Sequence, residues 1–241
     1  MHNRGKAIDI GEAPLYGIPE AAFYLDIPVN TLRSWVSGRV YPTKGGPKFF
    51  HPLIDLADPI ERQMSFYNLV EAHVILTFRA HYDIPIPKIR DAMDYLRGRI
   101  QHEHPLITQE FYTFGKDLIV KQLGASEKTA EVMINASRKG QLGIKDVLEI
   151  YLRRIKRTPI GMPAGLYPLR RRLPLNQPDI VEINPTVAFG NPVLKGTGVT
   201  IAMLLDRHQF GRTPMEIAED YDLDKNTVKE AIEFYEGKRA A

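Results

Sequence analysis

The chain has 241 residues, of which 44% are hydrophobic and 25% charged, with no cysteine and a formal net charge of +3. This composition is ordinary for a globular domain, and the lack of cysteine excludes disulfides, thiolate zinc sites and a cysteine nucleophile. No apolar run reaches the roughly 18 residues of a transmembrane helix, and the polar residues 1–6 do not resemble a signal peptide, so we expect a cytoplasmic protein that does not enter the membrane.

Charge is unevenly distributed along the chain. Residues 1–104 carry 12 basic and 12 acidic groups. Residues 105–177 carry 13 basic and 6 acidic groups, and residues 178–241 carry 7 basic and 11 acidic groups. Charge blocks of this kind predict partners of opposite sign. The middle block suits phosphates or an acidic protein surface, whereas the acidic C-terminal block is a poor DNA contact.

The first structured unit has the pattern of two short helices and a hairpin. Pro19 suits the first turn of a helix, and Leu32, Trp35 and Val36 recur at the spacing of one face of a second helix that ends at Gly38. Residues 39–50 read as two extended pieces around Gly-Gly. After a leader at residues 1–14, this order predicts a winged helix-turn-helix domain over residues 15–104.

A winged helix-turn-helix places the polar face of its second helix against base edges and the cations of its wing against phosphates. The predicted DNA-binding residues are Asn30, Thr31, Arg33 and Ser34 on the helix and Arg39, Lys44 and Lys48 on the wing. The alternative is a small helical subdomain whose charges only face solvent.

Three segments of this unit resemble the MerR-type winged helix, a resemblance that covers residues 15–98. The segments are Ile18-Pro19-Glu20-Ala21-Ala22, Thr31-Leu32-Arg33-Ser34-Trp35 and Ile86-Pro87-Lys88-Ile89-Arg90. The resemblance implies that Arg33, Arg39 and Lys44 are the strongest DNA candidates. Pro28 departs from the pattern, since the family usually has a capping Ser or Thr there, and it predicts a weak cap for the second helix.

The middle of the chain is predicted to form a scaffold over residues 105–157. Before it, Ser65 should cap a helix that runs to Ala80, and Pro87 should start another helix. Residues 110–120 suggest strand, turn and strand around Gly115-Lys116, followed by helices at 126–137 and 144–157. Residues 158–178 contain five prolines, which predicts a basic linker or extended arm.

The last module, residues 179–236 before a tail at 237–241, combines a strand, a loop rich in Gly and Pro, and short helices. Thr213 and Glu216 form a predicted capping box, with Pro214 at the first helical position. The last two helices could also read DNA, through Lys225, Asn226 and Lys229. Because the module is acidic, we favour protein–protein packing, including homodimerisation.

This module resembles the small C-terminal domain of VapB-type antitoxins, which neutralise the toxin of a type II toxin–antitoxin pair. The resemblance rests on residues 180–187 and on Asn191-Pro192-Val193-Leu194-Lys195-Gly196-Thr197. It implies a PIN-like toxin, a magnesium-dependent ribonuclease, as partner. Gly198 stands where the family usually has Arg, so any contact made by that Arg is absent here.

Nucleases of this kind hold carboxylates around their metal ions, and a guanidinium can satisfy a carboxylate in bidentate fashion. The predicted toxin-binding residues are Arg170, Arg171 and Arg172 as first choice, then Arg153, Arg154 and Arg157, with the tail pair Lys238-Arg239 also basic. The alternative is a set of charges that only face solvent.

No pattern predicts catalysis, a metal site or a cofactor. His102, Glu103 and His104, like His73 and His81, lack the i, i+4 spacing of a zinc helix, and we expect His102 and His104 to be exposed at a helix end. Asp220, Asp222 and Asp224 lack the glycine and distal glutamate of a calcium loop.

The sequence therefore predicts a mainly α-helical protein with short β hairpins that acts as a DNA-binding antitoxin. It would neutralise a cognate PIN-like ribonuclease, bind operator DNA to regulate its own operon, and work as a homodimer or larger toxin–antitoxin assembly. The alternatives are a stand-alone MerR-like transcription regulator and a purely structural scaffold.

Overall fold

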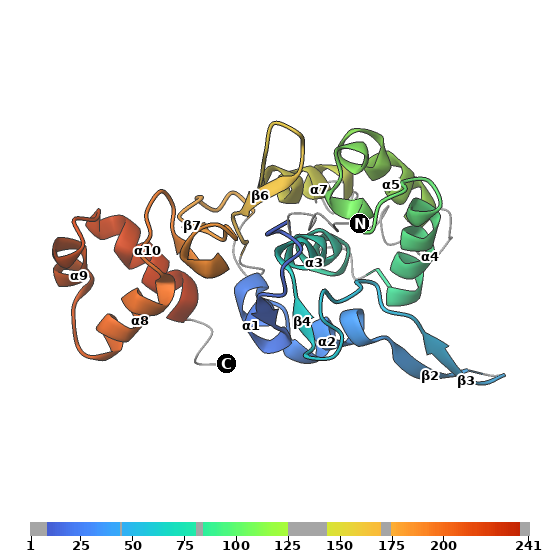
Figure 1. Cartoon of the computed structure of the whole chain (residues 1–241), viewed down its shortest axis with the longest axis horizontal. Helices are drawn as coiled ribbons and strands as arrows, with labels where there is room; N and C mark the ends of the chain where they lie inside the picture. The colour runs from blue at the N-terminus through green and yellow to red at the C-terminus, as the bar shows by residue number, and fades with distance from the viewer. Residues whose placement is uncertain (1–8, 44, 81–83, 125–143, 170–174, 237–241) are drawn as a thin grey trace, which may run out of the picture.

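The computed structural model describes residues 9–43, 45–80, 84–124, 144–169 and 175–236. Within them, α-helices dominate and the strands form two-stranded antiparallel sheets (Figure 1). The predicted fold class, mainly α with short β hairpins, is confirmed. Among the described residues, no helix combines the length and the apolar character that crossing a bilayer requires.

The N-terminal elements match the predicted helix pair and hairpin. They are β1 (Tyr16–Gly17), α1 (Ile18–Leu25), α2 (Val29–Ser37), β2 (Arg39–Thr43), β3 (Gly46–Phe50) and β4 (Gln63–Met64). β1 pairs with β4, and β2 pairs with β3 from Arg39 opposite Phe50 to Thr43 opposite Gly46. Gly38 ends α2 with a φ of 65°, a value that glycine adopts at little cost. The β2–β3 hairpin projects away from the helices (Figure 1).

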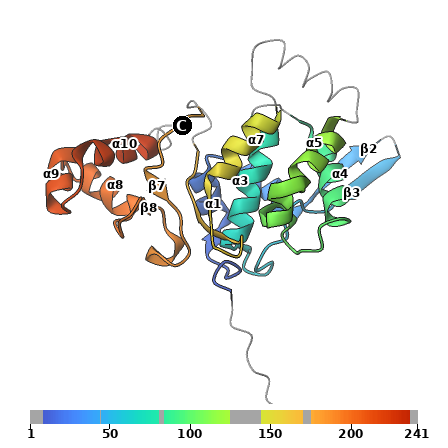
Figure 2. The same cartoon turned by 90° about the horizontal axis from the view of Figure 1, so that it is seen from above.

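Helix α3 (Phe66–Ala80) lies at the centre of the larger part of the molecule. As predicted, Ser65 caps it, because its hydroxyl oxygen accepts a hydrogen bond of 3.1 Å from the backbone N–H of Asn68. Every residue from Met64 to Phe78 is buried. Helices α1 and α7 (Ile144–Arg153) pack against α3, and α4 (Ile86–Arg97) and α5 (Lys116–Gly124) pack against each other beside it (Figure 2).

The strand–turn–strand prediction for residues 110–120 is wrong. After the short 3₁₀ helix η1 (Pro105–Ile107), the chain forms a π-helical turn, η2 (Phe111–Gly115), which runs directly into α5. Phe111, Ile119 and Leu123 are fully buried, and they follow a helical period that the aromatic and β-branched residues between them obscure. Gly115 serves packing rather than a hairpin turn, since a Cβ there would lie 2.8 Å from Phe111 Cδ2.

The prediction of a linker over residues 158–178 also needs correction. Helix α7 ends at Arg153, and β5 (Ile155–Arg157) pairs with β6 (Pro163–Leu166) to form a hairpin. Leu166 in turn bridges to Ile183. The prolines in this stretch therefore accompany a folded hairpin. The predicted helix at 126–137 lies outside the described residues.

The C-terminal module has its own apolar core. Its elements are β7 (Val181–Glu182), η3 (Ala188–Gly190), β8 (Val193–Leu194), α8 (Ile201–Gln209), α9 (Pro214–Asp220) and α10 (Lys225–Glu236). The predicted capping box of Thr213 and Glu216 is confirmed. Asp224 caps α10 by accepting a hydrogen bond of 2.8 Å from the Thr227 N–H. Ile217, Val228 and Ile232 pack together in the core.

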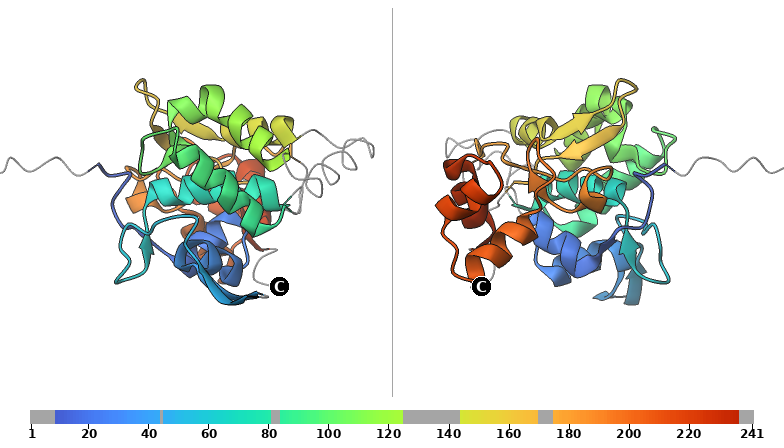
Figure 3. Two further views of the ribbon diagram at one scale, coloured as in Figure 1. Left: turned by 90° about the vertical axis from the view of Figure 1, so that its right-hand side faces the viewer. Right: turned by 60° about the vertical axis from the view of Figure 1, so that its left-hand side comes forward.

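The C-terminal module contacts the N-terminal helices through α1 (Figure 3). The hydroxyl of Tyr16 donates a hydrogen bond of 3.1 Å to the Gly190 carbonyl, and that of Tyr24 donates one of 3.2 Å to Asn191 Oδ1. The rings of Phe23 and Tyr235 lie 5.4 Å apart, centroid to centroid. The first helix of the predicted DNA-binding unit is thus also a docking surface for the C-terminal module.

Two glycine substitutions test this docking contact. Gly190 and Gly196 both have positive φ, 78° and 77°, but a Cβ on Gly190 would lie 2.4 Å from the Tyr16 hydroxyl, whereas one on Gly196 meets no atom within 4 Å. Both Gly→Ala changes carry a backbone cost of roughly 1–2 kcal/mol. We predict that Gly190→Ala lowers the free energy of unfolding by roughly 1–3 kcal/mol more than Gly196→Ala, because it also overpacks the contact. Urea denaturation followed by circular dichroism measures both; equal losses would contradict a close contact at Gly190.

Candidate functional site

The helix-turn-helix is built by an apolar face on α2 and a three-residue turn. Asp26 takes the left-handed conformation, with a φ of 56°, so the chain can reverse between α1 and α2. Leu32 and Trp35 are fully buried and Val36 nearly so, which fixes the opposite face of α2 outward. Pro28 is the N-cap and provides no side-chain hydrogen bond, as the sequence predicted.

Two of the four predicted helix residues are exposed to solvent. Asn30 and Arg33 are exposed, and Arg33 Nη1 donates a hydrogen bond of 2.9 Å to Asn30 Oδ1. Thr31 and Ser34 are half-buried, and the Ser34 hydroxyl donates to the Thr31 carbonyl at 2.7 Å. The amide of Asn30 therefore holds the guanidinium of Arg33 over the outer face of α2, where a duplex would lie in a helix-turn-helix complex.

Two of the three predicted wing cations belong to the hairpin that follows α2. Arg39 begins β2 opposite Phe50, and Lys48 lies on β3 opposite Tyr41, whereas Lys44 lies outside the described residues. The cross-strand pair Val40 and Phe49 is exposed, at 57% and 51%. The hairpin thus presents an apolar pair to solvent.

Three arginines that the sequence did not single out brace the wing and the end of α2. Arg90 and Arg97 on α4 donate hydrogen bonds of 2.9 Å to the carbonyls of His51 and Leu53, just after β3. Arg62 donates one of 2.9 Å to the Ser37 hydroxyl at the end of α2. These partners are 25 to 44 residues apart, so no local pattern could have indicated them.

Two of the predicted toxin-binding arginines are bound within the chain. Arg154 is 8% exposed, donates to the carbonyls of Tyr167 and Gln177 at 2.9 and 2.8 Å, and forms an ion pair with Asp179. Arg157 donates to the Ile107 carbonyl at 2.6 Å and lies over the Tyr112 ring. Both guanidiniums therefore have structural roles, which removes Arg154 and Arg157 from the second set of candidates for an exposed toxin contact.

Arg153 is placed differently. Its side chain is 74% exposed and lies 3.9 Å from Glu149 on the same helix, and it borders an open cleft of about 620 Å³. Leu175, Asn176 and Gln177 form the other side of this cleft. Arg170, Arg171 and Arg172 lie outside the described residues, which resume at Leu175.

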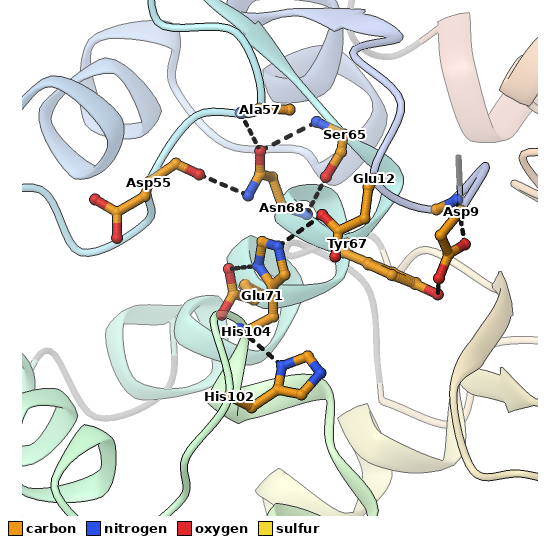
Figure 4. A network of polar contacts seen from close by, with 11 residues as sticks. Asp9, Glu12, Asp55, Ala57, Ser65, Tyr67, Asn68, Glu71, His102 and His104 are labelled. Carbon is orange, nitrogen blue, oxygen red and sulfur yellow. Dashed lines mark hydrogen bonds and ion pairs between the residues drawn. The ribbon is translucent and has the colours of Figure 1, made fainter. Parts of the chain in front are cut away.

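A buried polar network surrounds His104, contrary to the expectation that it is exposed. His104 is 7% exposed; its Nδ1 lies 2.9 Å from Glu71 Oε2 and its Nε2 lies 2.9 Å from Glu12 Oε2 (Figure 4). Burial alone lowers the pKa of His104, but hydrogen bonds and charges from Glu71 and Glu12 raise it to about 9. Burial also raises the pKa of Glu71, against the effect of His104.

Asn68, also on α3, holds the loop before β4. It accepts from the N–H groups of Ala57 and Ser65, both at 3.1 Å, and donates to the Asp55 carbonyl at 2.9 Å (Figure 4). Elsewhere on α3, His73 Nε2 lies 3.0 Å from the Tyr151 carbonyl, and burial lowers its pKa to about 4. His73 is therefore a neutral hydrogen-bond donor in the core.

Two family models match the chain at the places where the structure has its two helix-turn units. Residues 14–93 match a model described as "Putative DNA-binding HTH domain". Residues 181–235 match one described as "Protein of unknown function (DUF433)". The first range contains α1, α2 and the wing, and the second contains the module from β7 to α10.

Relatives align over nearly the whole chain. A protein of Mycobacterium tuberculosis named "Putative antitoxin VapB45" is 26% identical over 92% of this chain and 94% of its own length. Another from the same organism, "Uncharacterized protein Rv2308", is 27% identical over 94% of this chain and 92% of its own. The crystal structure of Rv2018 from M. tuberculosis has the same fold, with a TM-score of 0.66 at 24% identity over 91% of this chain and 97% of that one.

The buried network predicts a specific pH dependence of stability. Because the folded-state pKa of His104, about 9, exceeds its ordinary value of 6.5, its contribution is complete below pH 6.5 and is lost as the pH rises through 9. A shift of this size corresponds to at most about 3 kcal/mol. We predict that the chain, kept in EDTA, loses stability between pH 6.5 and 9.

The double variant Glu71→Gln/His104→Gln is the control, since it removes both titrating groups from the pair. Its free energy of unfolding should change less over the same interval in urea titrations at matched ionic strength. An equal decline in both proteins would show that other groups cause the pH dependence.

Proposed function

We propose that this chain is a DNA-binding antitoxin that neutralises a PIN-like ribonuclease and binds the operator of its own operon. The observation that carries the proposal is the combination of an exposed Arg33–Asn30 pair on a helix-turn-helix with a full-length alignment to a protein named as an antitoxin. The match of residues 14–93 to a DNA-binding helix-turn-helix model supports the DNA-binding half.

Charge distinguishes α2 from α10 as the helix that would read DNA. Helix α2 contains no acidic residue and carries Arg33 on its exposed face. Helix α10 carries Glu230, Glu233 and Glu236, all exposed, and Lys229 lies 3.8 Å from Glu233. Phosphates repel carboxylates and attract cations, so we assign the base contacts to α2 and the backbone contacts to the β2–β3 hairpin.

The C-terminal module has a surface suited to protein contacts. Met203, Phe210 and Met215 are 41%, 87% and 51% exposed on the α8–α9 segment. We propose that these side chains contribute to one contact with another protein chain, which fits homodimerisation better than DNA contact. A dimer with two DNA-binding heads would gain affinity through effective concentration.

For the toxin contact, we retain Arg170, Arg171 and Arg172 as first candidates and Arg153 as the next. Arg153 and Leu175 line the same cleft, which is where the chain resumes after the arginine run. Arginine suits this role because its planar fork matches a carboxylate in two hydrogen bonds. A nuclease centre with several carboxylates would meet a basic surface here.

The first prediction of this proposal concerns DNA. Arg33→Ala should weaken binding to the DNA upstream of the chain's own gene by about 10- to 100-fold, the cost of one specific base contact. Arg207→Ala is the matched control, since Arg207 is also an exposed arginine on a helix, α8. Fluorescence anisotropy at fixed salt measures both affinities. Equal weakening by the two variants would contradict a specific role for α2.

The second prediction concerns inhibition of the nuclease encoded in the same operon. The triple variant Arg170→Gln/Arg171→Gln/Arg172→Gln should inhibit RNA cleavage at least about 10-fold less well than the natural chain, because it loses charge and bidentate contacts. The triple Lys variant keeps the charge and should inhibit to an intermediate degree. Inhibition that is unchanged in the Gln variant would remove this segment from the toxin contact.

A further inference from the structure

Three potential metal ligands from distant parts of the sequence meet beside α3. Glu12, Glu103 and His104 each offer a ligand atom, and these atoms all lie within 4.8 Å of one another. Glu12 precedes β1, whereas Glu103 and His104 precede η1. The spacing of the histidines in the sequence argued against a metal site, but it could not indicate a glutamate 92 residues away.

The imidazole of His104 is held in the orientation of a metal ligand. Its Nδ1 is hydrogen-bonded at 2.9 Å to the carboxylate of Glu71, which is 3% exposed and lies on α3. Its Nε2 points away from α3 toward Glu12 (Figure 4). A carboxylate that fixes one ring nitrogen while the other faces the metal is the usual support of a histidine ligand.

The ligand set selects the kind of ion. One imidazole nitrogen and two carboxylate oxygens suit a borderline divalent metal such as zinc better than the hard cation Mg²⁺, which prefers oxygen alone. Zinc bonds to nitrogen and oxygen of about 2.0–2.2 Å place tetrahedral ligand atoms about 3.3–3.5 Å apart. The His104 Nε2 and Glu12 Oε2 atoms, 2.9 Å apart, already approach this spacing.

We propose that Glu12, Glu103 and His104 bind one zinc ion, with water in the fourth position, and that Glu71 orients His104 for it. The ion would replace the proton that His104 and Glu12 share in the metal-free chain. Glu103 is exposed and Glu12 half-exposed, so both carboxylates can turn toward the ion without disturbing the core.

Such a site would cross-link the segment that precedes β1 to the segment that leads into η1. The same N-terminal stretch is already tied to α3 by the hydrogen bond of 2.8 Å from the Tyr67 hydroxyl to Asp9 (Figure 4). Since neither Glu12 nor His104 lies on α2 or the wing, zinc would stabilise the fold without contacting DNA.

The test is a calorimetric titration of the untagged full chain with zinc chloride at pH 7.5, after removal of metals with EDTA. We expect one zinc per chain and a higher melting temperature with zinc than with magnesium. The double variant Glu12→Gln/Glu103→Gln leaves the buried His104–Glu71 pair intact and should lose the binding. Glu71→Gln should weaken it by roughly 10- to 100-fold, the usual effect of removing the support of a histidine ligand.

His51→Ala is the matched control, because His51 is exposed and lies outside the cluster, and it should bind zinc like the natural chain. Circular dichroism establishes that each variant is folded. The proposal is overturned if the natural chain takes up no zinc, if Glu12→Gln/Glu103→Gln binds it equally well, or if His51→Ala loses it.

Discussion

The burial of α3 from Phe66 to Phe78 is the constraint on which the rest of the structure depends. A helix that is buried on every side must be surrounded by other elements before its apolar surface leaves water. No single neighbour can do this, so α1, α4 and α7, from residues 18 to 153, meet around one core. The helix-turn-helix is consequently not an independent domain. Helix α1 packs into the same core as α7 and the β5–β6 hairpin, and its contact with α3 fixes the orientation of the helix-turn-helix.

The polar residues on α3 make that packing specific. Buried polar groups are costly unless each finds its partner, and here Asn68 holds the loop before β4, Glu71 holds His104, and His73 contacts the carbonyl of Tyr151. Arg154 has the same role at the boundary of the C-terminal module, where its guanidinium contacts three backbone carbonyls and Asp179. Among the described residues, the exposed face of α2, the surface of α8 and α9 and the cleft beside Arg153 remain accessible to partners.

Local patterns in the sequence predicted the helices and caps that depend on residues close together in the chain. They failed where contacts between residues far apart in the chain determine the structure. The apolar spacing of Leu32, Trp35 and Val36, the cap at Ser65 and the capping box at Thr213 all appear as predicted. The turn at Gly115 was misread because its neighbours are aromatic and β-branched residues common in strands, although Phe111, Ile119 and Leu123 share a helical face.

Arg154, Arg157 and His104 were expected to be exposed, because nothing near them in sequence reveals the carbonyls and carboxylates that bury them. The sequence proposed Asn30 and Arg33 as DNA contacts, and the structure shows them as an exposed hydrogen-bonded pair. It gave no sign of the hydrogen bonds from Arg90 and Arg97 on α4 to the segment after the wing.

The most direct measurement is a pull-down of the tagged chain from its native cell, with identification of the copurified protein and an assay of that protein alone. Our account predicts a small protein with several acidic residues at its active site, whose ribonuclease activity appears when it is separated from this chain and disappears when the chain is returned. Recovery of the chain by itself, still bound to specific DNA, would contradict the antitoxin function and favour a stand-alone transcription regulator.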